Sequence, residues 1–227
     1  MKPKVAYIDS FNFSSESLES MLLDEEKYSI EVIKSVGVFE HQRWLEVFGK
    51  KLISNIIEAK MLHTHTGLTL AIKRYSSSSC KQTLEFAGLH SYNEKSKYLR
   101  ELLKEIWGQI QDNVITRVDV AIDFNGNIPT RTIKKLKKSR RLFQWKNTTY
   151  LKTYKEKKSN SYINIYCYPK HKKNNNNLDY EMERLEFSFG SAYLRGNSKV
   201  RDSEEVYKKM IKTIKRLSGI NIEIQTI

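Results

Sequence analysis

The stretch VITRVDVAIDF, residues 114–124, decides the fold class of this chain. Its residues alternate as in a strand, so that Val118, Val120 and Ile122 point to one side and the charged residues among them point to the other. The apolar side has to be covered, because burying apolar surface is the main force that stabilises a fold. The stretch therefore predicts a sheet with one apolar face packed on helices and one face that carries charge.

The segments on both sides of this strand show helical and strand-like periodicity in turn. Residues 1–27 predict short turns or at most one amphipathic helix, residues 28–39 alternate like a strand, and residues 41–61 have helical spacing. Further along, strand-like runs occupy residues 68–75, 82–87, 148–154, 162–168, 182–189 and 220–227, and helical patterns occupy residues 98–110, 130–142 and 199–217.

This order predicts an α+β fold with an antiparallel-rich central sheet and helices packed on one face. Residues 1–80 are expected to form an N-terminal α/β segment that continues into the main sheet, and residues 81–227 to hold the charged strands. The 227 residues are enough to bury a core without disulfide or metal staples, in one compact domain overall.

The net charge of +14 is concentrated in one segment. Residues 130–173 contain 15 Lys or Arg and one acid, whereas the rest of the chain has 25 basic and 25 acidic side chains. Aromatic residues interleave with these cations, as in Phe143, Trp145 and Tyr150. Such a segment is typical of a surface that contacts a nucleic-acid backbone, and the alternative is a solvated lysine-rich face.

Compartment and membrane contact follow from what the sequence lacks. Cys80 and Cys167 are too few for a disulfide framework, and the N-terminal residues show no apolar run of signal-peptide length. No stretch approaches the roughly 20 apolar residues that a membrane helix needs. We therefore expect a cytoplasmic protein with no membrane association.

Two strands place carboxylates where a metal ion could bind. Asp119 and Asp123 lie four residues apart on one strand, about 13 Å by strand rise, so one of them would need a carboxylate from another strand as its partner. The run Glu183–Phe189 repeats the pattern, with Arg184 and Glu186 on one face. Asp119 and Glu186 are therefore predicted to meet across the sheet, and the alternative is a ladder of ion pairs.

A third strand ends in a tyrosine with a lysine two residues on. Tyr168 is expected to be accessible at the strand end, and Lys170 follows it. A tyrosine nucleophile needs a cation to offset the phosphate charge and a group that favours the phenolate, because its free pKa is about 10. Lys170 and a metal ion held by Asp119 and Glu186 would supply both. Tyr166, two residues earlier, would be the nucleophile in another register.

Taken in order, these pieces resemble the Rep_trans family of rolling-circle plasmid and phage replication initiators, which are relaxase-like nickases. The resemblance covers about residues 84–190 and rests on LEFAG at 84–88, the helix with Trp107, RVDVAID at 117–123, the paired strands that end in Tyr-x-Lys at 168–170, and RLE at 184–186. It implies a replication-initiator fold with the nickase-like catalytic region in residues 81–227.

The resemblance also implies an activity and its residues. Tyr168 would attack an origin strand, leaving a 5′-phosphotyrosine and a 3′-OH primer, with Mg²⁺ or Mn²⁺ on Asp119 and Glu186 and with Lys170 on the phosphate. The implied partners are single-stranded or cruciform origin DNA, a second copy of the chain in a homodimer, and a host helicase. The residues expected to contact DNA are Arg184, Lys134, Lys135, Lys137, Lys138, Arg140, Arg141 and Lys172.

Three alternatives remain open from the sequence. The same basic surface would serve a regulator that binds nucleic acid without catalysis, and aromatics on a basic sheet would also stack the bases of RNA. His63 and His65 face one side of a strand and form a second candidate metal site, for which a polar hairpin end is the simpler explanation.

Overall fold

The structure is a computed structural model of the chain. It describes residues 3–16, 18, 26–33, 38–49, 52, 55–76, 81–138, 140–153, 163–172, 180–194 and 198–226.

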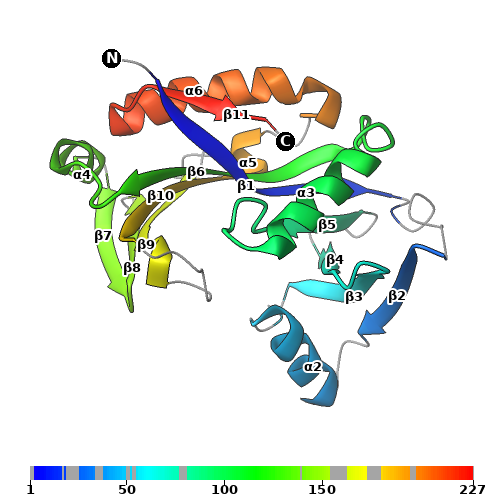
Figure 1. The fold of residues 1–227 in the computed structure, drawn as a ribbon. Helices are drawn as coiled ribbons and strands as arrows, with labels where there is room; N and C mark the ends of the chain where they lie inside the picture. Colours follow the sequence, from blue (N-terminus) through cyan, green and yellow to red (C-terminus); the bar gives the residue numbers. More distant parts are fainter. Residues whose placement is uncertain are drawn as a thin grey trace.

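Eleven strands within the described residues form a single sheet (Figure 1). Its order is β2-β3-β4-β5-β1-β6-β10-β9-β8-β7, and β11 pairs with β1 from outside this path. The β1–β11 pair is parallel and the other pairs are antiparallel. The strands are β1 (Lys4–Ser15), β2 (Tyr28–Ile33), β3 (Ile56–Thr64), β4 (Thr69–Tyr75), β5 (Gln82–Ala87), β6 (Val114–Asn125), β7 (Arg140–Trp145), β8 (Thr148–Thr153), β9 (Ile163–Pro169), β10 (Met182–Gly190) and β11 (Ile222–Gln225).

Helices cover parts of both faces of this sheet. They are α2 (Val38–Phe48), α3 (Glu94–Ile106), α4 (Thr130–Lys137), α5 (Ser191–Leu194) and α6 (Ser203–Ser218), with the 3-10 turns η2 (Lys170–Lys172) and η3 (Val200–Asp202). Among the described residues, no helix is long and apolar enough to cross a membrane.

Strand β6 has the predicted alternation and lies at the centre of the sheet. Val118, Val120 and Ile122 are fully buried in the main core, which also contains Met210 and Ile214 of α6. Helix α6 lies along this side of the sheet in Figure 1. The α+β class and the antiparallel-rich sheet are therefore confirmed, and the apolar side of β6 is the side that α6 covers.

Helix α2 is an exception to the prediction that the helices share one face. Its Trp44 is fully buried in a second, smaller core with Met61 and Ala71 of β3 and β4. Ala71 pairs with Glu85, and directly paired residues of antiparallel strands point to the same side. The row continues through β1 to Arg117 of β6, so α2 lies on the charged side of the sheet.

Strand β1 overturns the prediction of turns or one helix for residues 1–27. It pairs with β5, β6 and β11, and its Phe11 and Phe13 are fully buried. The predicted helix 130–142 is also shorter: α4 ends at Lys137, and the residues from Arg140 pair with β8 as strand β7. In the same way, the helical spacing of residues 41–61 covers both α2 and the start of β3. Pairing with neighbouring strands outweighs local periodicity in these segments.

Candidate active site

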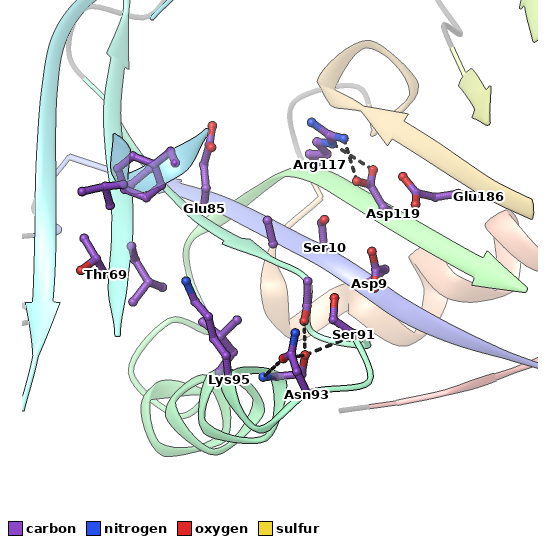
Figure 2. A pocket seen from close by; sticks show the side chains of 18 of the residues that line it. Asp9, Ser10, Thr69, Glu85, Ser91, Asn93, Lys95, Arg117, Asp119 and Glu186 are labelled. Atoms are coloured by element: carbon purple, nitrogen blue, oxygen red, sulfur yellow. Dashed lines mark hydrogen bonds and ion pairs between the residues drawn. The ribbon is translucent and has the colours of Figure 1, made fainter. Parts of the chain in front are cut away.

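A cavity of about 480 Å³ opens on the charged side of the sheet (Figure 2). Strands β1, β5, β6 and β10 supply much of its polar lining, and residues at the beginning of α3 form another wall. The polar residues that line it include Asp9, Ser10, Glu85, Ser91, Asn93, Lys95, Arg117, Asp119, Tyr168, Lys170 and Glu186. The cavity thus brings together all four residues expected to carry catalysis and metal binding, which are Asp119, Tyr168, Lys170 and Glu186.

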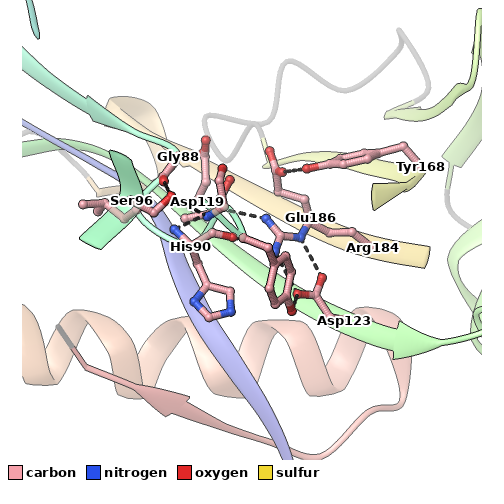
Figure 3. A network of polar contacts seen from close by, with 12 residues as sticks. Gly88, His90, Ser96, Asp119, Asp123, Tyr168, Arg184 and Glu186 are labelled. Atoms are coloured by element: carbon pink, nitrogen blue, oxygen red, sulfur yellow. Dashed lines mark hydrogen bonds and ion pairs between the residues drawn. The ribbon is translucent and has the colours of Figure 1, made fainter. Parts of the chain in front are cut away.

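Tyr168 is held by Glu186 on the neighbouring strand. The tyrosine Oη donates a hydrogen bond of 2.6 Å to Glu186 Oε2 (Figure 3). Both side chains are buried, and Tyr168 is only 4% exposed, so the prediction of an accessible tyrosine is corrected. Burial, followed by the negative charge of Glu186, raises the pKa of Tyr168 well above its usual value. The phenol is therefore protonated at neutral pH, and its proton already points at a carboxylate.

Asp119 is held by an arginine of its own strand. Arg117 donates to both carboxylate oxygens of Asp119, from Nε at 2.9 Å and from Nη2 at 2.7 Å. Asp119 is buried, whereas the Arg117 side chain is 43% exposed. Burial lowers the pKa of Arg117, but the charge of Asp119 and the hydrogen bonds to it outweigh burial and raise the pKa overall. This ion pair joins two residues of one strand, and it borders the cavity.

Asp119 and Glu186 lie on adjacent strands, one rung apart. Asp119 pairs with Ser188 and Glu186 pairs with Ala121, so both side chains are on the same side of the sheet. The two carboxylates are therefore diagonal neighbours on one side of the sheet.

Arg184 is the centre of a separate network. Its Nε and Nη2 donate to the two oxygens of Asp123 at 2.6 and 2.8 Å, and its Nη1 donates to Asp9 at 2.8 Å. Nη2 also donates to the His90 carbonyl at 2.9 Å, and Tyr92 donates to Asp123 at 2.7 Å.

The guanidinium of Arg184 is hydrogen-bonded to other groups of the protein. Its side chain is fully buried. Burial lowers the pKa of Arg184, while Asp123 and Asp9 raise it by more; Asp123 in turn has a pKa below its usual value, because Arg184 outweighs the effect of burial. Arg184 is therefore removed from the set of residues expected to contact DNA.

Arg140 is removed from that set for the same reason. Its Nη1 donates to the carbonyls of Ile163 at 2.6 Å and Leu151 at 3.2 Å, and the residue is buried. The guanidinium joins three segments of the β7–β9 region and is not presented to a ligand.

The remaining predicted DNA contacts are exposed but do not form one surface. Helix α4 packs beside α6, on the side of the sheet opposite the cavity. Arg141 belongs to β7, and Lys172 follows the cavity residue Lys170 by two positions. The exposed lysines of α4 and its end are Lys134, Lys135, Lys137 and Lys138.

The carboxylates present fit a divalent cation in their chemistry. Among the described residues, no group of three His, Cys, Asp or Glu is placed to hold a metal ion. Mg²⁺ often uses only one or two carboxylates together with water and substrate phosphate, which Asp119 and Glu186 match. A carboxylate has about four lone-pair sites, and Arg117 occupies two of those on Asp119, so capacity for a metal remains.

The second candidate metal site is engaged in protein contacts. The His63 ring nitrogens lie 3.0 Å from Thr69 Oγ1 and 3.0 Å from Glu31 Oε2. His65 Nδ1 lies 3.4 Å from the Lys27 carbonyl. The simpler explanation, a polar hairpin end, accounts for these contacts.

Sequence reasoning missed Asp9 and Tyr92, which complete the network around Arg184. A signal for Asp9 was present: residues 4–15 contain no Gly or Pro, and Phe11 and Phe13 alternate with Ser10 and Asn12 as in a strand. Tyr92 lies in the turn before α3 and gives no such signal.

Comparison with solved structures shows a likeness to a replication initiator. No protein-family model matches the chain, and no curated protein gives a significant match. The chain is similar to the structure of a rolling circle replication initiator protein from Geobacillus stearothermophilus, with 14% sequence identity and a TM-score of 0.42. The likeness covers 93% of this chain and 85% of that one.

Proposed function

We propose that this protein is a DNA-nicking and strand-joining enzyme that initiates replication by cutting an origin strand through Tyr168. The observation that carries the proposal is the hydrogen bond from Tyr168 Oη to Glu186, in a cavity that Asp119, Arg117 and Lys170 also line. A hydroxyl nucleophile, a carboxylate that can take its proton, and cations for a phosphate are the parts that phosphodiester transfer requires. The Rep_trans resemblance of residues 84–190 agrees with this chemistry.

The proton of the nucleophile has a defined acceptor. Tyr168 Oη attacks the phosphorus, its proton passes to Glu186, and the bond from phosphorus to the 3′ oxygen breaks. The 3′ oxygen takes a proton from solvent and leaves as a hydroxyl, while the 5′ phosphate stays on Tyr168. Rejoining reverses these steps with a new 3′ hydroxyl.

Two cations line the cavity that Tyr168 borders. Lys170 and Arg117 line the same cavity and would attract the scissile phosphate. Mg²⁺ or Mn²⁺ on Asp119 and Glu186 would offset the charge that develops on that phosphate. DNA in single-stranded or cruciform form is the substrate in this proposal, and a homodimer and a host helicase are its expected partners.

A second function is favoured by the burial of the same residues. Tyr168 is 4% exposed and Asp119 is already paired with Arg117, which suits a protein that binds nucleic acid without cutting it. Covalent capture of DNA separates the two functions, because only the enzyme forms an adduct.

The test is incubation with Mg²⁺ or Mn²⁺ and labelled single-stranded fragments of the replicon that encodes the chain, followed by a denaturing gel. We expect a covalent adduct with the wild type and with Tyr166→Phe, and none with Tyr168→Phe, although Tyr168→Phe still binds DNA. Glu186→Gln, which keeps a hydrogen-bond acceptor for Tyr168, should lose the adduct while melting at nearly the wild-type temperature.

Other outcomes would change the proposal in defined ways. Loss of the adduct only in Tyr166→Phe keeps the reaction but moves the nucleophile. No adduct on any fragment, with salt-sensitive binding intact, supports the non-catalytic function.

A further inference from the structure

A row of aromatic side chains runs from the edge of the sheet to the Tyr168–Glu186 pair. Phe143 of β7 pairs with Tyr150 of β8, Tyr150 pairs with Tyr166 of β9, and Tyr166 pairs with Glu186 of β10. Directly paired residues point to the same side, so the three rings lie on the charged side of the sheet. Trp145 is two residues beyond Phe143 on the same strand and shares this side.

These rings enclose a cleft separate from the catalytic cavity. A hollow of about 320 Å³ is lined by Phe143, Trp145, Tyr150 and Tyr166, with Asn164 beside them. That volume is at the small end of ligand pockets, which suits a flat group rather than a folded partner.

The rings of the cleft are arranged at steep angles. Tyr150 stands edge-on to Tyr166 with ring centroids 5.4 Å apart, and Phe143 is tilted against Tyr150 at 6.0 Å. The outer rings are open to solvent: Phe143 is 47% exposed and Trp145 is 60% exposed. Neighbouring exposed aromatics of this kind are common at binding sites.

The charge around the cleft favours a polyanion. Apart from the buried Arg140, residues 140–153, which form β7, β8 and their turn, contain three Lys or Arg and no Asp or Glu. Lys146 in the turn has a φ of 50°, a conformation that Gly or Asn adopts more readily, so a cation stands beside Trp145 at some conformational cost.

We propose that this cleft binds an unpaired base of single-stranded DNA by stacking it on Trp145 and Phe143, next to the site of cleavage. The choice of DNA rests on the proposed function, because the row of paired residues leads directly to Glu186 and the nucleophile. Stacking on aromatic faces tolerates any base, so the cleft fixes the position of the strand and leaves sequence choice to other contacts.

The test measures binding of a short fluorescent oligodeoxynucleotide to the full chain in EDTA, where no cleavage is expected. Trp145→Ala and Phe143→Ala should each weaken binding by about 5- to 150-fold, the usual loss when a stacking ring is removed. Trp145→Phe should restore part of the affinity. Leu142→Ala is the matched control, because Leu142 is 44% exposed on the same strand but points to the other side, and it should bind like the wild type.

An oligomer with abasic positions separates stacking from charge. It should bind the wild type more weakly than the intact oligomer and should lose nothing further on Trp145→Ala. The dependence of binding on salt should be the same for the wild type and Trp145→Ala, because no cation is removed. Melting temperatures of all variants are the control for an intact fold.

The results that overturn the proposal are distinct from those that overturn nicking. Trp145→Ala and Phe143→Ala binding as tightly as the wild type, or abasic DNA binding as tightly as intact DNA, would refute the stacking cleft. Tighter binding of the same sequence as RNA would refute the choice of DNA. Binding that depends on Trp145, from a wild type that forms no covalent adduct, refutes the proposed nicking and leaves the stacking cleft standing.

Discussion

Two Arg-x-acid patterns on neighbouring strands, Arg117-x-Asp119 on β6 and Arg184-x-Glu186 on β10, are used in opposite ways. Arg117 pairs with Asp119 of its own strand and is 43% exposed at the cavity. Arg184 is fully buried and pairs with Asp9 and Asp123 of other strands. The difference teaches that solvent access and the number of partners, not the pattern, separate a charge that holds the fold from one that remains accessible at a cavity.

The largest effect on stability is expected from removing Arg184, the centre of the buried network. Arg184→Met leaves Asp9 and Asp123 buried without their cation, which should lower the free energy of unfolding by about 3–5 kcal/mol. Arg117→Met, measured beside it by urea denaturation, should cost only about 1–3 kcal/mol, because Asp119 borders a cavity that admits water. Equal losses in the two variants would abolish the distinction between the networks.

An intermediate effect on stability is expected at acid pH, and it arises at His90, whose carbonyl accepts a hydrogen bond from Arg184. Burial, followed by the charge of Arg184, lowers the pKa of His90 to about 4. Unfolding returns His90 to its usual pKa of about 6.5, so the unfolded chain binds the extra proton and stability falls as the pH drops from about 6.5 to about 4. His90→Phe keeps a ring to stack on Tyr7, 3.6 Å away in the wild type, and should lose less stability over this window.

Urea denaturation at closely spaced pH values gives the measurement for His90. The Asp123 carboxyl, whose pKa lies below its usual value, loses its contribution at lower pH than this window. Parallel profiles for the wild type and His90→Phe would show that acid acts elsewhere.

The smallest expected effect is on the salt dependence of DNA binding, and it tests how far the proposed DNA path extends from the cavity. Arg141→Gln on β7 should lower the salt dependence of single-strand binding by about 0.7 in log–log slope, the value for one phosphate contact. Lys134→Gln and Lys137→Gln on α4 should leave the slope for a short oligomer unchanged, because α4 lies on the opposite side of the sheet. All three variants should keep their stability within about 0.5 kcal/mol. A lower slope for the α4 variants would extend the DNA path around the molecule.

Strong periodicity in the sequence predicted much of the fold. The alternation of residues 114–124 and 182–189 corresponds to β6 and β10, and the helical spacing of residues 199–217 corresponds largely to α6. Strand β1 was missed because Ser and Glu dilute residues 1–27, and its central place depends on three partner strands. The end of α4 was missed because β7 forms only by pairing with β8.

The sequence alone determined which residue types could do chemistry and where they lie: Asp119 on β6, Tyr168 near the end of β9 with Lys170 just after it, and Glu186 on β10. Only the tertiary structure decided that Tyr168 is buried and donates a hydrogen bond to Glu186, that Arg184 and Arg140 serve the fold, and that the basic segment divides between two sides of the sheet. The physical reason is that periodicity assigns a side chain to a face of its own strand, whereas its partners and its access to water depend on the register and layers of the whole sheet.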